Sequence, residues 1–333
     1  MRRFAAILTL ALGLAAPGLA LAAEPYGIGL EGFAYPYPVT MLKLPSEGED
    51  LRMAYMDVKP TANANGRAVL LLHGRNFPSS YWEPVIKALT AAGYRAVVPD
   101  QVGFGKSSKP LAEMSFDDLA RHTAYLLDQL HLDRVDVVAH SMGGMLAVRF
   151  TRSYPARVDR LLLEAPVGLE DYRIYVPPVT TERLLQVEDA LDAEGYRRQL
   201  VTNYSLTLPP EQVTPFIESR MRIKEAADYP RWLLAFVNTY QTLYREPVVY
   251  DYPLIAQKTL FIMGANDHNA PGRPYAPEAL RAKMGENAKL AQGIAAKMPD
   301  AKAIVFDGVG HLVHLEAIDK FNAAMLAFLN APR

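Results

Sequence analysis

One uninterrupted apolar run constrains the fold of this 333-residue chain more than any other feature. Residues 68–72 read Ala-Val-Leu-Leu-Leu and lead directly into His73 and Gly74. A run without polar alternation is typical of a strand buried on both faces, as in a parallel sheet covered by helices. From residue 39 onward, apolar strand-like segments alternate with amphipathic helical segments. This alternation predicts the α/β fold class with a mostly parallel sheet.

The order of these segments predicts one α/β core rather than two consecutive domains. Residues 39–44 and 51–57 are the expected opening antiparallel pair. The other expected strands are 68–73, 94–99, 134–139, 158–163, 258–263 and 301–306, and the expected helices are 81–92, 116–130, 142–154 and 313–329. From residue 168 to about 250 we expect no buried strand but three helical stretches, at 181–203, 210–226 and 231–245. These stretches read as a helical insertion into the core.

Residues 1–22 have the pattern of a signal peptide. A pair of arginines at positions 2 and 3 precedes the apolar run 4–14, and Ala20-Leu21-Ala22 supplies the small residues that a signal peptidase accepts. Pro17 and Gly18 break the apolar stretch, so we expect no stable membrane anchor, although an uncleaved, membrane-tethered form is the alternative. We therefore expect cleavage after Ala22, one mature domain of residues 23–333, and a periplasmic or secreted protein.

Composition narrows the class of partner. The formal net charge is −1, and the basic residues are spread along the chain, which argues against a nucleic-acid partner. The chain contains no cysteine, which excludes disulfides, a thiol nucleophile and thiolate metal ligands. We expect a small-molecule substrate and neither a metal nor an organic cofactor. The sequence does not indicate the oligomeric state.

A candidate nucleophile follows the strand at 134–139. That strand runs into His140-Ser141-Met142-Gly143-Gly144 and then into a helix, so a serine stands at the tip of a strand–turn–helix junction. A nucleophile on such a sharp turn projects clear of the sheet, and small residues two positions to either side, here Ala139 and Gly143, let the backbone close. The alternative is that Ser141 only caps the helix.

The turn after the first buried strand is the expected partner of that serine. Acyl transfer requires two amide donors that face the developing oxyanion. We expect these donors to be the backbone amides of Met142 and Arg75, while His73 and Gly74 support the turn. An ordinary glycine turn at a strand end is the alternative.

The base and the acid are expected from loops after later strands. His311 lies between the last expected strand and the last expected helix, and glycines precede it at positions 308 and 310. Asp267 follows the strand at 258–263, which gives the chain order Ser, Asp, His. We expect His311 to act as the base and Asp267 to orient it. Glu164 and Asp171 are the alternative acids.

Taken together, these segments resemble the α/β-hydrolase superfamily over nearly all of the chain after residue 22. The residues that carry the resemblance are His73-Gly74, Pro99-Asp100 with Gly103-Phe104-Gly105, Ala139 to Gly144, Gly264 to Asp267, and Gly310-His311. The resemblance implies an eight-stranded sheet flanked by helices, with a helical cap at about residues 168–250 inserted after the sixth strand. Within the superfamily the chain is most similar to bacterial esterases, enol-lactonases, cofactor-free haloperoxidases and carbon–carbon bond hydrolases.

The resemblance implies a serine hydrolase that forms an acyl-enzyme on an ester-like substrate. A lactone, an amide or a carbon–carbon bond are alternative targets, and a non-catalytic binding protein is the alternative from another class. Epoxide hydrolases and haloalkane dehalogenases share the His-Gly turn and the cap, but they need a carboxylate where this chain has Ser141.

Three features bear on specificity. The Arg75 side chain favours anionic substrates if it faces the pocket and has no such role if it faces solvent. The stripe Trp232, Phe236, Tyr240 and Tyr244 either packs the cap onto the core or lines the pocket. The long loop 269–285 is expected to be an ordered excursion near the pocket mouth.

Overall fold

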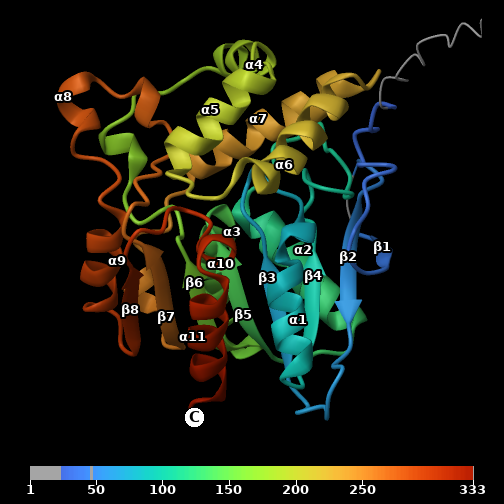
Figure 1. Ribbon diagram of the computed structural model, residues 1–333, viewed down its shortest axis with the longest axis vertical. Helices are drawn as coiled ribbons and strands as arrows, with labels where there is room; N and C mark the ends of the chain where they lie inside the picture. The colour runs from blue at the N-terminus through green and yellow to red at the C-terminus, as the bar shows by residue number, and fades with distance from the viewer. Residues whose placement is uncertain (1–23, 46–47, 333) are drawn as a thin grey trace, which may run out of the picture.

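The computed structural model describes residues 24–45 and 48–332, and its centre is an eight-stranded sheet (Figure 1). The strands follow the order β1-β2-β4-β3-β5-β6-β7-β8, with antiparallel pairing from β1 to β2 and from β2 to β4 and parallel pairing elsewhere. Their bounds are β1 Val39–Lys43, β2 Arg52–Val58, β3 Ala68–Leu72, β4 Arg95–Pro99, β5 Val135–His140, β6 Val158–Glu164, β7 Lys258–Gly264 and β8 Ala301–Phe306. The predicted mostly parallel α/β sheet is therefore confirmed.

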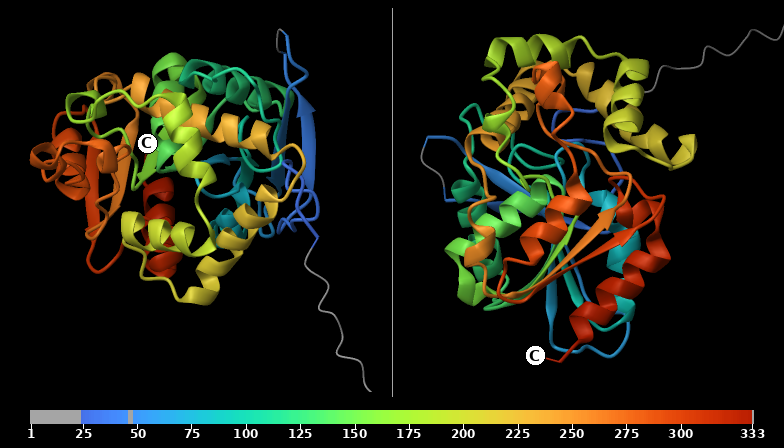
Figure 2. Two further views of the ribbon diagram at one scale, coloured as in Figure 1. Left: turned by 90° about the horizontal axis from the view of Figure 1, so that it is seen from above. Right: turned by 90° about the vertical axis from the view of Figure 1, so that its left-hand side faces the viewer.

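Helices cover both faces of this sheet (Figures 1 and 2). One face carries α1, α10 and α11, and the other carries α2, α3 and α9. Their bounds are α1 Glu83–Ala91, α2 Phe116–Gln129, α3 Met142–Ser153, α9 Asn287–Ala295, α10 Val313–Glu316 and α11 Ile318–Asn330.

Alternate residues of each central strand enter different cores. Leu70 and Leu72 of β3 pack in the core beneath α2 and α3, whereas Val69 and Leu71 pack in the core beneath α1 and α11. Every residue of β3 is fully or almost fully buried. This double burial is the physical reason for the apolar run in the sequence, because successive side chains of a strand point to opposite faces.

The cap lies between β6 and β7, above the carboxyl ends of the parallel strands (Figure 1). Within residues 168–250 it contains four α-helices, α4 Thr181–Asp189, α5 Ala193–Tyr204, α6 Pro210–Lys224 and α7 Tyr229–Arg245. The prediction of one helical stretch at 181–203 is wrong in one respect, because the structure divides this segment into α4 and α5. Asp192 causes the division: its carboxylate accepts the amide of Gly195 at 2.6 Å and caps a new helix.

The predicted helix 313–329 also divides, into α10 and α11. The first turn is held to the end of β6, since the His314 amide donates to Glu164, and it is closed on itself where the Glu316 carboxylate accepts the amide of Leu312. At Ala317 the backbone leaves the helical region with φ −136°, and α11 then runs along the sheet.

The segment 24–37, here called the N-terminal strap, joins the core to the cap. The Tyr35 hydroxyl donates to Asp100 at 2.6 Å on the core side, and Leu30 is buried among the cap residues Ile223 and Trp232. At its start, the Tyr26 amide donates to the Arg222 carbonyl on α6. The expected signal peptide lies outside the described residues. Within residues 24–45 and 48–332, no helix has the length and apolar character needed to cross a membrane.

Candidate active site

Ser141 stands at the tip of the turn between β5 and α3. Its backbone has φ 56°, a left-handed conformation that few residues other than glycine adopt. The turn is closed by Gly143, where a Cβ atom would lie 2.4 Å from the Leu72 carbonyl oxygen. The predicted need for a small residue at position 143 thus has a direct steric cause in the neighbouring strand β3.

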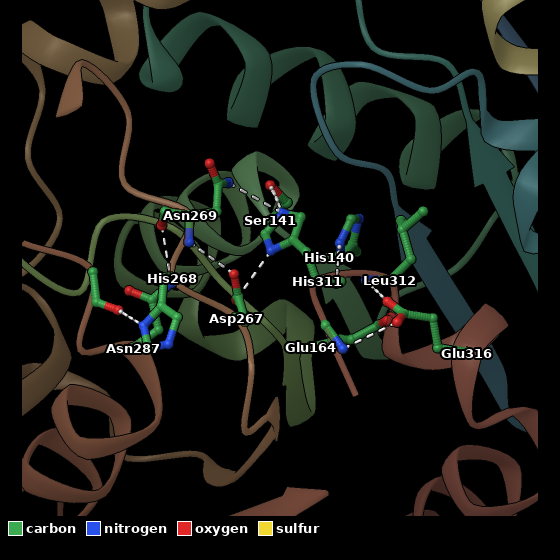
Figure 3. A network of polar contacts seen from close by, with 12 residues as sticks. His140, Ser141, Glu164, Asp267, His268, Asn269, Asn287, His311, Leu312 and Glu316 are labelled. Carbon is green, nitrogen blue, oxygen red and sulfur yellow. Dashed lines mark hydrogen bonds and ion pairs between the residues drawn. The ribbon is translucent and has the colours of Figure 1, made fainter. Parts of the chain in front are cut away.

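A chain of hydrogen bonds connects Ser141 with His311 and Asp267 (Figure 3). His311 Nε2 lies 2.9 Å from Ser141 Oγ, and His311 Nδ1 lies 3.0 Å from Asp267 Oδ2. Asp267 and His311 are each 1% exposed and Ser141 is 6% exposed. The three side chains expected from sequence therefore meet above the carboxyl ends of β5, β7 and β8 in the geometry of a base between an acid and a hydroxyl.

The acid is itself held in place. The Asn269 amide donates to Asp267 Oδ1 at 3.0 Å, and the Asn269 side-chain nitrogen lies 3.3 Å from His311 Nε2. Asn287 at the start of α9 donates to the Asn269 carbonyl at 2.9 Å (Figure 3). Asn269 thus contacts both the acid and the base, a role that no motif in the sequence indicates.

The turn after β3 presents a backbone amide beside the serine. The Gly74 amide donates to the Tyr81 hydroxyl at 2.9 Å, whereas the Arg75 amide has no hydrogen-bond partner among the described residues. Met142 is the first residue of α3, so its amide has no acceptor within the helix. The amides of Arg75 and Met142, the two predicted oxyanion donors, are therefore the ones left available.

His73 fixes the same turn as a neutral imidazole. Its Nδ1–H donates to the Gly74 carbonyl at 2.7 Å, and its Nε2 accepts the amide of Gln101 at 2.9 Å. Burial lowers the pKa of His73, which is consistent with this neutral tautomer. The geometry agrees with the supporting role expected for His73 and Gly74.

His140 and Tyr81 connect the three loops of the site. The Tyr81 hydroxyl accepts from Gly74 and donates to His140 Nδ1 at 3.0 Å, while His140 Nε2 donates to the His311 carbonyl at 3.0 Å. Burial lowers the pKa of His140 well below its usual range, and the neighbouring imidazoles act in the same direction. A neutral His140, which directly precedes Ser141, thus links the Gly74 turn, through Tyr81, to the backbone of the base.

Two further residues hold the His311 loop, and sequence reasoning missed both. Glu316 accepts the amide of Leu312 at 3.0 Å (Figure 3). It also accepts the amide of Gly310 at 3.0 Å and the Thr207 hydroxyl of the cap at 2.7 Å. Tyr204, the last residue of α5, stacks on the His311 ring with centroids 4.7 Å apart, and its carbonyl accepts the His311 amide at 2.9 Å.

The alternative acids do not contact His311. Glu164 accepts from the ring and the amide of His314, at 2.7 and 2.8 Å. Asp171 pairs with Arg173 at 2.7 Å and accepts the Tyr250 hydroxyl at 3.0 Å. Asp267 is therefore the only one of the three carboxylates placed to orient the base.

Two cavities lie beside this site, here called the apolar cavity and the arginine cavity, and Gly103 lines both of them. The apolar cavity has a volume of about 330 Å³, counting the part open to solvent, and is lined by Val102, Met114, Phe116, Leu119, Met142 and Ala235. The arginine cavity encloses about 450 Å³, counting the part open to solvent, and is lined by Leu30, Arg75, Tyr196, Arg220, Trp232 and Phe236.

The Arg75 side chain turns into the cap rather than toward bulk solvent. Its Nε donates to the Thr239 hydroxyl at 2.8 Å, and its guanidinium lies 3.7 Å from the centre of the Phe236 ring. Burial lowers the pKa of Arg75, and Glu188 opposes that shift. An arginine nevertheless stays protonated in such surroundings, so a full positive charge faces the arginine cavity.

The aromatic stripe of α7 has both of the alternative roles. Trp232 and Phe236 stack on each other at 4.9 Å and line the arginine cavity. Tyr244 instead donates to the Val176 carbonyl, and Tyr240 packs near Tyr275. The loop 269–285 contributes Ala270, Ala276 and Met284 to a cluster with Tyr244 and Tyr275, so it packs against the cap. In the described part of the chain, no group of three or more His, Cys, Asp or Glu side chains is arranged to hold a metal ion.

Comparison with known proteins places these features in context. A family model for the alpha/beta hydrolase fold matches residues 67–318, a span that includes Ser141, Asp267 and His311. The crystal structure of a probable hydrolytic enzyme from Pseudomonas aeruginosa PAO1 is 38% identical, with a TM-score of 0.89, and the match covers 93% of this chain and 99% of that chain.

Two named relatives match over most of their length. The 2-hydroxy-6-oxononadienedioate/2-hydroxy-6-oxononatrienedioate hydrolase 1 of Dechloromonas aromatica is 29% identical, and the match covers 85% of this chain and 92% of that protein. The 2-hydroxy-6-oxo-6-phenylhexa-2,4-dienoate hydrolase of Burkholderia cepacia is 27% identical over 79% of this chain and 88% of that protein.

Proposed function

Because this chain belongs to the alpha/beta hydrolase family and its relatives are hydrolases, we propose that it cleaves an ester-like carbonyl substrate through a serine acyl-enzyme. The proposal assigns Ser141 as nucleophile, His311 as base and Asp267 as the residue that orients the base. The observation that carries it is the continuous hydrogen-bond chain through these side chains, at 2.9 and 3.0 Å.

The first half of the reaction follows from these contacts. His311 Nε2 takes the proton of the Ser141 hydroxyl as Oγ attacks the carbonyl carbon. The amides of Arg75 and Met142 donate to the resulting oxyanion, and the positive end of the α3 dipole adds to its stabilisation. His311 then gives its proton to the leaving group, which leaves the acyl group on Ser141.

Water completes the cycle in the second half. His311 removes a proton from water, the hydroxide attacks the acyl-enzyme, and the proton returns to Ser141 Oγ as the acid product leaves. Throughout, Asp267 accepts from Nδ1–H and stabilises the imidazolium, and the Asn269 amide holds Asp267 in register.

A carbon–carbon bond hydrolase is the second candidate function. The two named relatives favour it, because one is a hydrolase of a 2-hydroxy-6-oxo dienoate, the other of a 2-hydroxy-6-oxo dienedioate or trienedioate, and both match most of this chain. In that reaction the same side chains would act on a ketone carbonyl rather than an ester. Turnover of p-nitrophenyl esters compared with turnover of a 2-hydroxy-6-oxo dienoate separates the two candidates.

Labelling with a fluorophosphonate probe tests the assigned nucleophile. We expect one probe per chain at Ser141, with labelling lost in Ser141→Ala and in His311→Ala. Ser153→Ala is the matched control, since Ser153 is exposed at the end of the same helix and should leave labelling unchanged. A folded wild-type protein that the probe does not label would contradict the proposal and favour a binding protein that has kept the fold.

A further inference from the structure

We propose that the arginine cavity is a carboxylate-binding subsite, so that the substrate is a carbonyl compound carrying one carboxylate on the arm that enters the cap. This inference rests on the proposed function, because it assumes that Ser141 attacks the same substrate. It names the class of that substrate, which neither the fold nor the Ser141–His311–Asp267 chain specifies.

The charges around the arginine cavity do not balance: Arg75 and Arg220 line it, and Glu188, which does not line it, pairs with both. Arg220 Nη2 donates to Glu188 Oε2 at 2.7 Å, and Arg75 Nη2 lies 3.8 Å from Glu188 Oε1. The side chains of Arg75, Arg220 and Glu188 are 14%, 6% and 12% exposed. Two guanidinium groups and one carboxylate leave a net charge of 2 − 1 = +1 in a largely buried space. An unbalanced charge away from water is costly unless an anion accompanies it.

The two guanidinium groups also have hydrogen-bond donors to spare. Arg75 uses Nε for Thr239 and Nη2 for the Phe236 carbonyl, and Arg220 uses Nη2 for Glu188. Arg220 also makes a side-chain hydrogen bond to Tyr196, and Nη1 of Arg75 makes no hydrogen bond to the described residues. A guanidinium presents five N–H donors in a planar fork, and such a fork matches the two oxygens of a carboxylate.

The walls of the cavity favour a carboxylate on an apolar or aromatic group. The Arg220 guanidinium lies 4.5 Å from the ring centre of Phe236, and Trp232 stacks on Phe236 at 4.9 Å. The excess charge of +1 matches one carboxylate, whereas a phosphate monoester carries roughly −1.5 to −2 at neutral pH. Low polarity in the walls strengthens the attraction between such a carboxylate and the arginines.

The position of Arg75 places this subsite next to the reacting carbonyl. Its backbone amide is a proposed oxyanion donor, while its side chain reaches Thr239 on α7, a residue that lines the apolar cavity. Arg75 therefore stands between the two cavities. A substrate whose carbonyl lies at Ser141 would extend its anionic arm into the arginine cavity and an apolar arm into the other.

Binding to the Ser141→Ala protein tests this inference without requiring turnover. The probes are benzoate and benzamide, which share a ring and a shape but differ in charge, with inorganic phosphate as a second anion, all followed by isothermal titration calorimetry. We expect benzoate to bind at least about tenfold more tightly than benzamide, because a charge-assisted bidentate contact is lost with the amide. Equal affinities, or displacement of benzoate by equimolar phosphate, would overturn the assignment of a carboxylate.

Two substitutions in the same background separate binding from folding. Arg220→Gln should weaken benzoate at least about tenfold, and Arg222→Gln, on the same helix but facing the N-terminal strap, should leave it unchanged. Glu188→Gln raises the net charge of the cavity and should tighten benzoate, an effect that damage to packing cannot produce. If Glu188→Gln weakens benzoate, the two arginines serve only to hold the cap together and the inference fails, even where Arg220→Gln does not fold.

Hydrolysis then distinguishes this inference from the proposed function. Wild-type enzyme should prefer p-nitrophenyl hydrogen glutarate to p-nitrophenyl valerate, which is of similar size but uncharged, and Arg220→Gln should abolish that preference. Turnover of both esters at equal kcat/KM would overturn the carboxylate subsite alone. Failure to turn over either ester, together with absent fluorophosphonate labelling, would overturn the assignment of Ser141 while the binding result stands on its own.

Discussion

Replacing Gly310 with alanine tests whether the cap positions the base. Gly310 precedes His311, and a Cβ atom there would lie 2.2 Å from the Ser205 carbonyl oxygen and 2.6 Å from that of Tyr204. Gly310 is not in the left-handed region, so the substitution adds a steric clash without a conformational penalty. A carbon and an oxygen approach to about 3.3 Å at closest, so the end of α5 and the His311 loop must separate by roughly 1 Å.

That separation should disable the site while the protein remains folded. It breaks the 2.9 Å bond from the His311 amide to the Tyr204 carbonyl and displaces the stacked ring of Tyr204. A displacement of about 1 Å in a catalytic group costs about 100-fold in rate, or about 2.7 kcal/mol of transition-state stabilisation. Crowding of this kind lowers the free energy of unfolding by about 1–3 kcal/mol.

The assay compares kcat/KM for p-nitrophenyl acetate with thermal unfolding in the same variants. Gly293→Ala is the matched control, because Gly293 lies inside α9 and a Cβ atom there meets nothing within 4 Å. It should keep full activity and gain about 0.5–1 kcal/mol in stability. Gly310→Ala with kcat/KM within about threefold of the wild type would refute the coupling between cap and base.

Three further predictions concern the acid, a buried lysine and the N-terminus. Asp267→Asn should lower kcat about 10³–10⁴-fold without unfolding the protein, because an amide does not hold the imidazole in the required tautomer; a loss below about tenfold would contradict the assigned role. Burial lowers the pKa of Lys109 to about 8, so between roughly pH 8 and 10 the unfolded chain binds more protons than the folded one, and the free energy of unfolding should rise with pH by roughly 1–3 kcal/mol. Urea unfolding at pH 8 and at pH 10 should show this rise in the free energy of unfolding in the wild type and not in Lys109→Met. An equal rise in the two proteins would contradict the lowered pKa of Lys109. Mass spectrometry of the exported protein should find Ala23 as the first residue, and a chain that starts at Met1 would exclude cleavage.

The strands could be predicted well because their signal is local. The run at 68–72 is apolar since each face of β3 packs under a different layer of helices, and the bounds of β8 agree with the predicted range. The ends of the helices were harder to predict. The break at Ala317 follows from contacts of Glu316 and His314 with residues more than a hundred positions away, such as Thr207 and Glu164, which no local pattern records.

The residues of the candidate site also fall into two groups, those that could be named from the sequence and those that could not. Ser141, Asp267 and His311 could be named because each follows a recognisable strand in the expected order, and the structure brings their side chains together. Tyr204 and Asn269 could not be named, since their significance lies in contacts made only after the cap and the acid loop have packed. The direction of the Arg75 side chain also depended on Thr239, 164 residues later in the chain.

The N-terminal strap bears on the order in which this chain acquires its structure. Tyr26 hydrogen-bonds to Arg222, across a separation of 222 − 26 = 196 residues. The start of the strap therefore has no partner until α6 has formed, although Tyr35 further along the strap can already contact Asp100 of the core. Contacts so distant in sequence form late and slow the search for the native state. A protease added early in refolding should cut between residues 24 and 37, at a place that the finished protein protects by tying it to the cap.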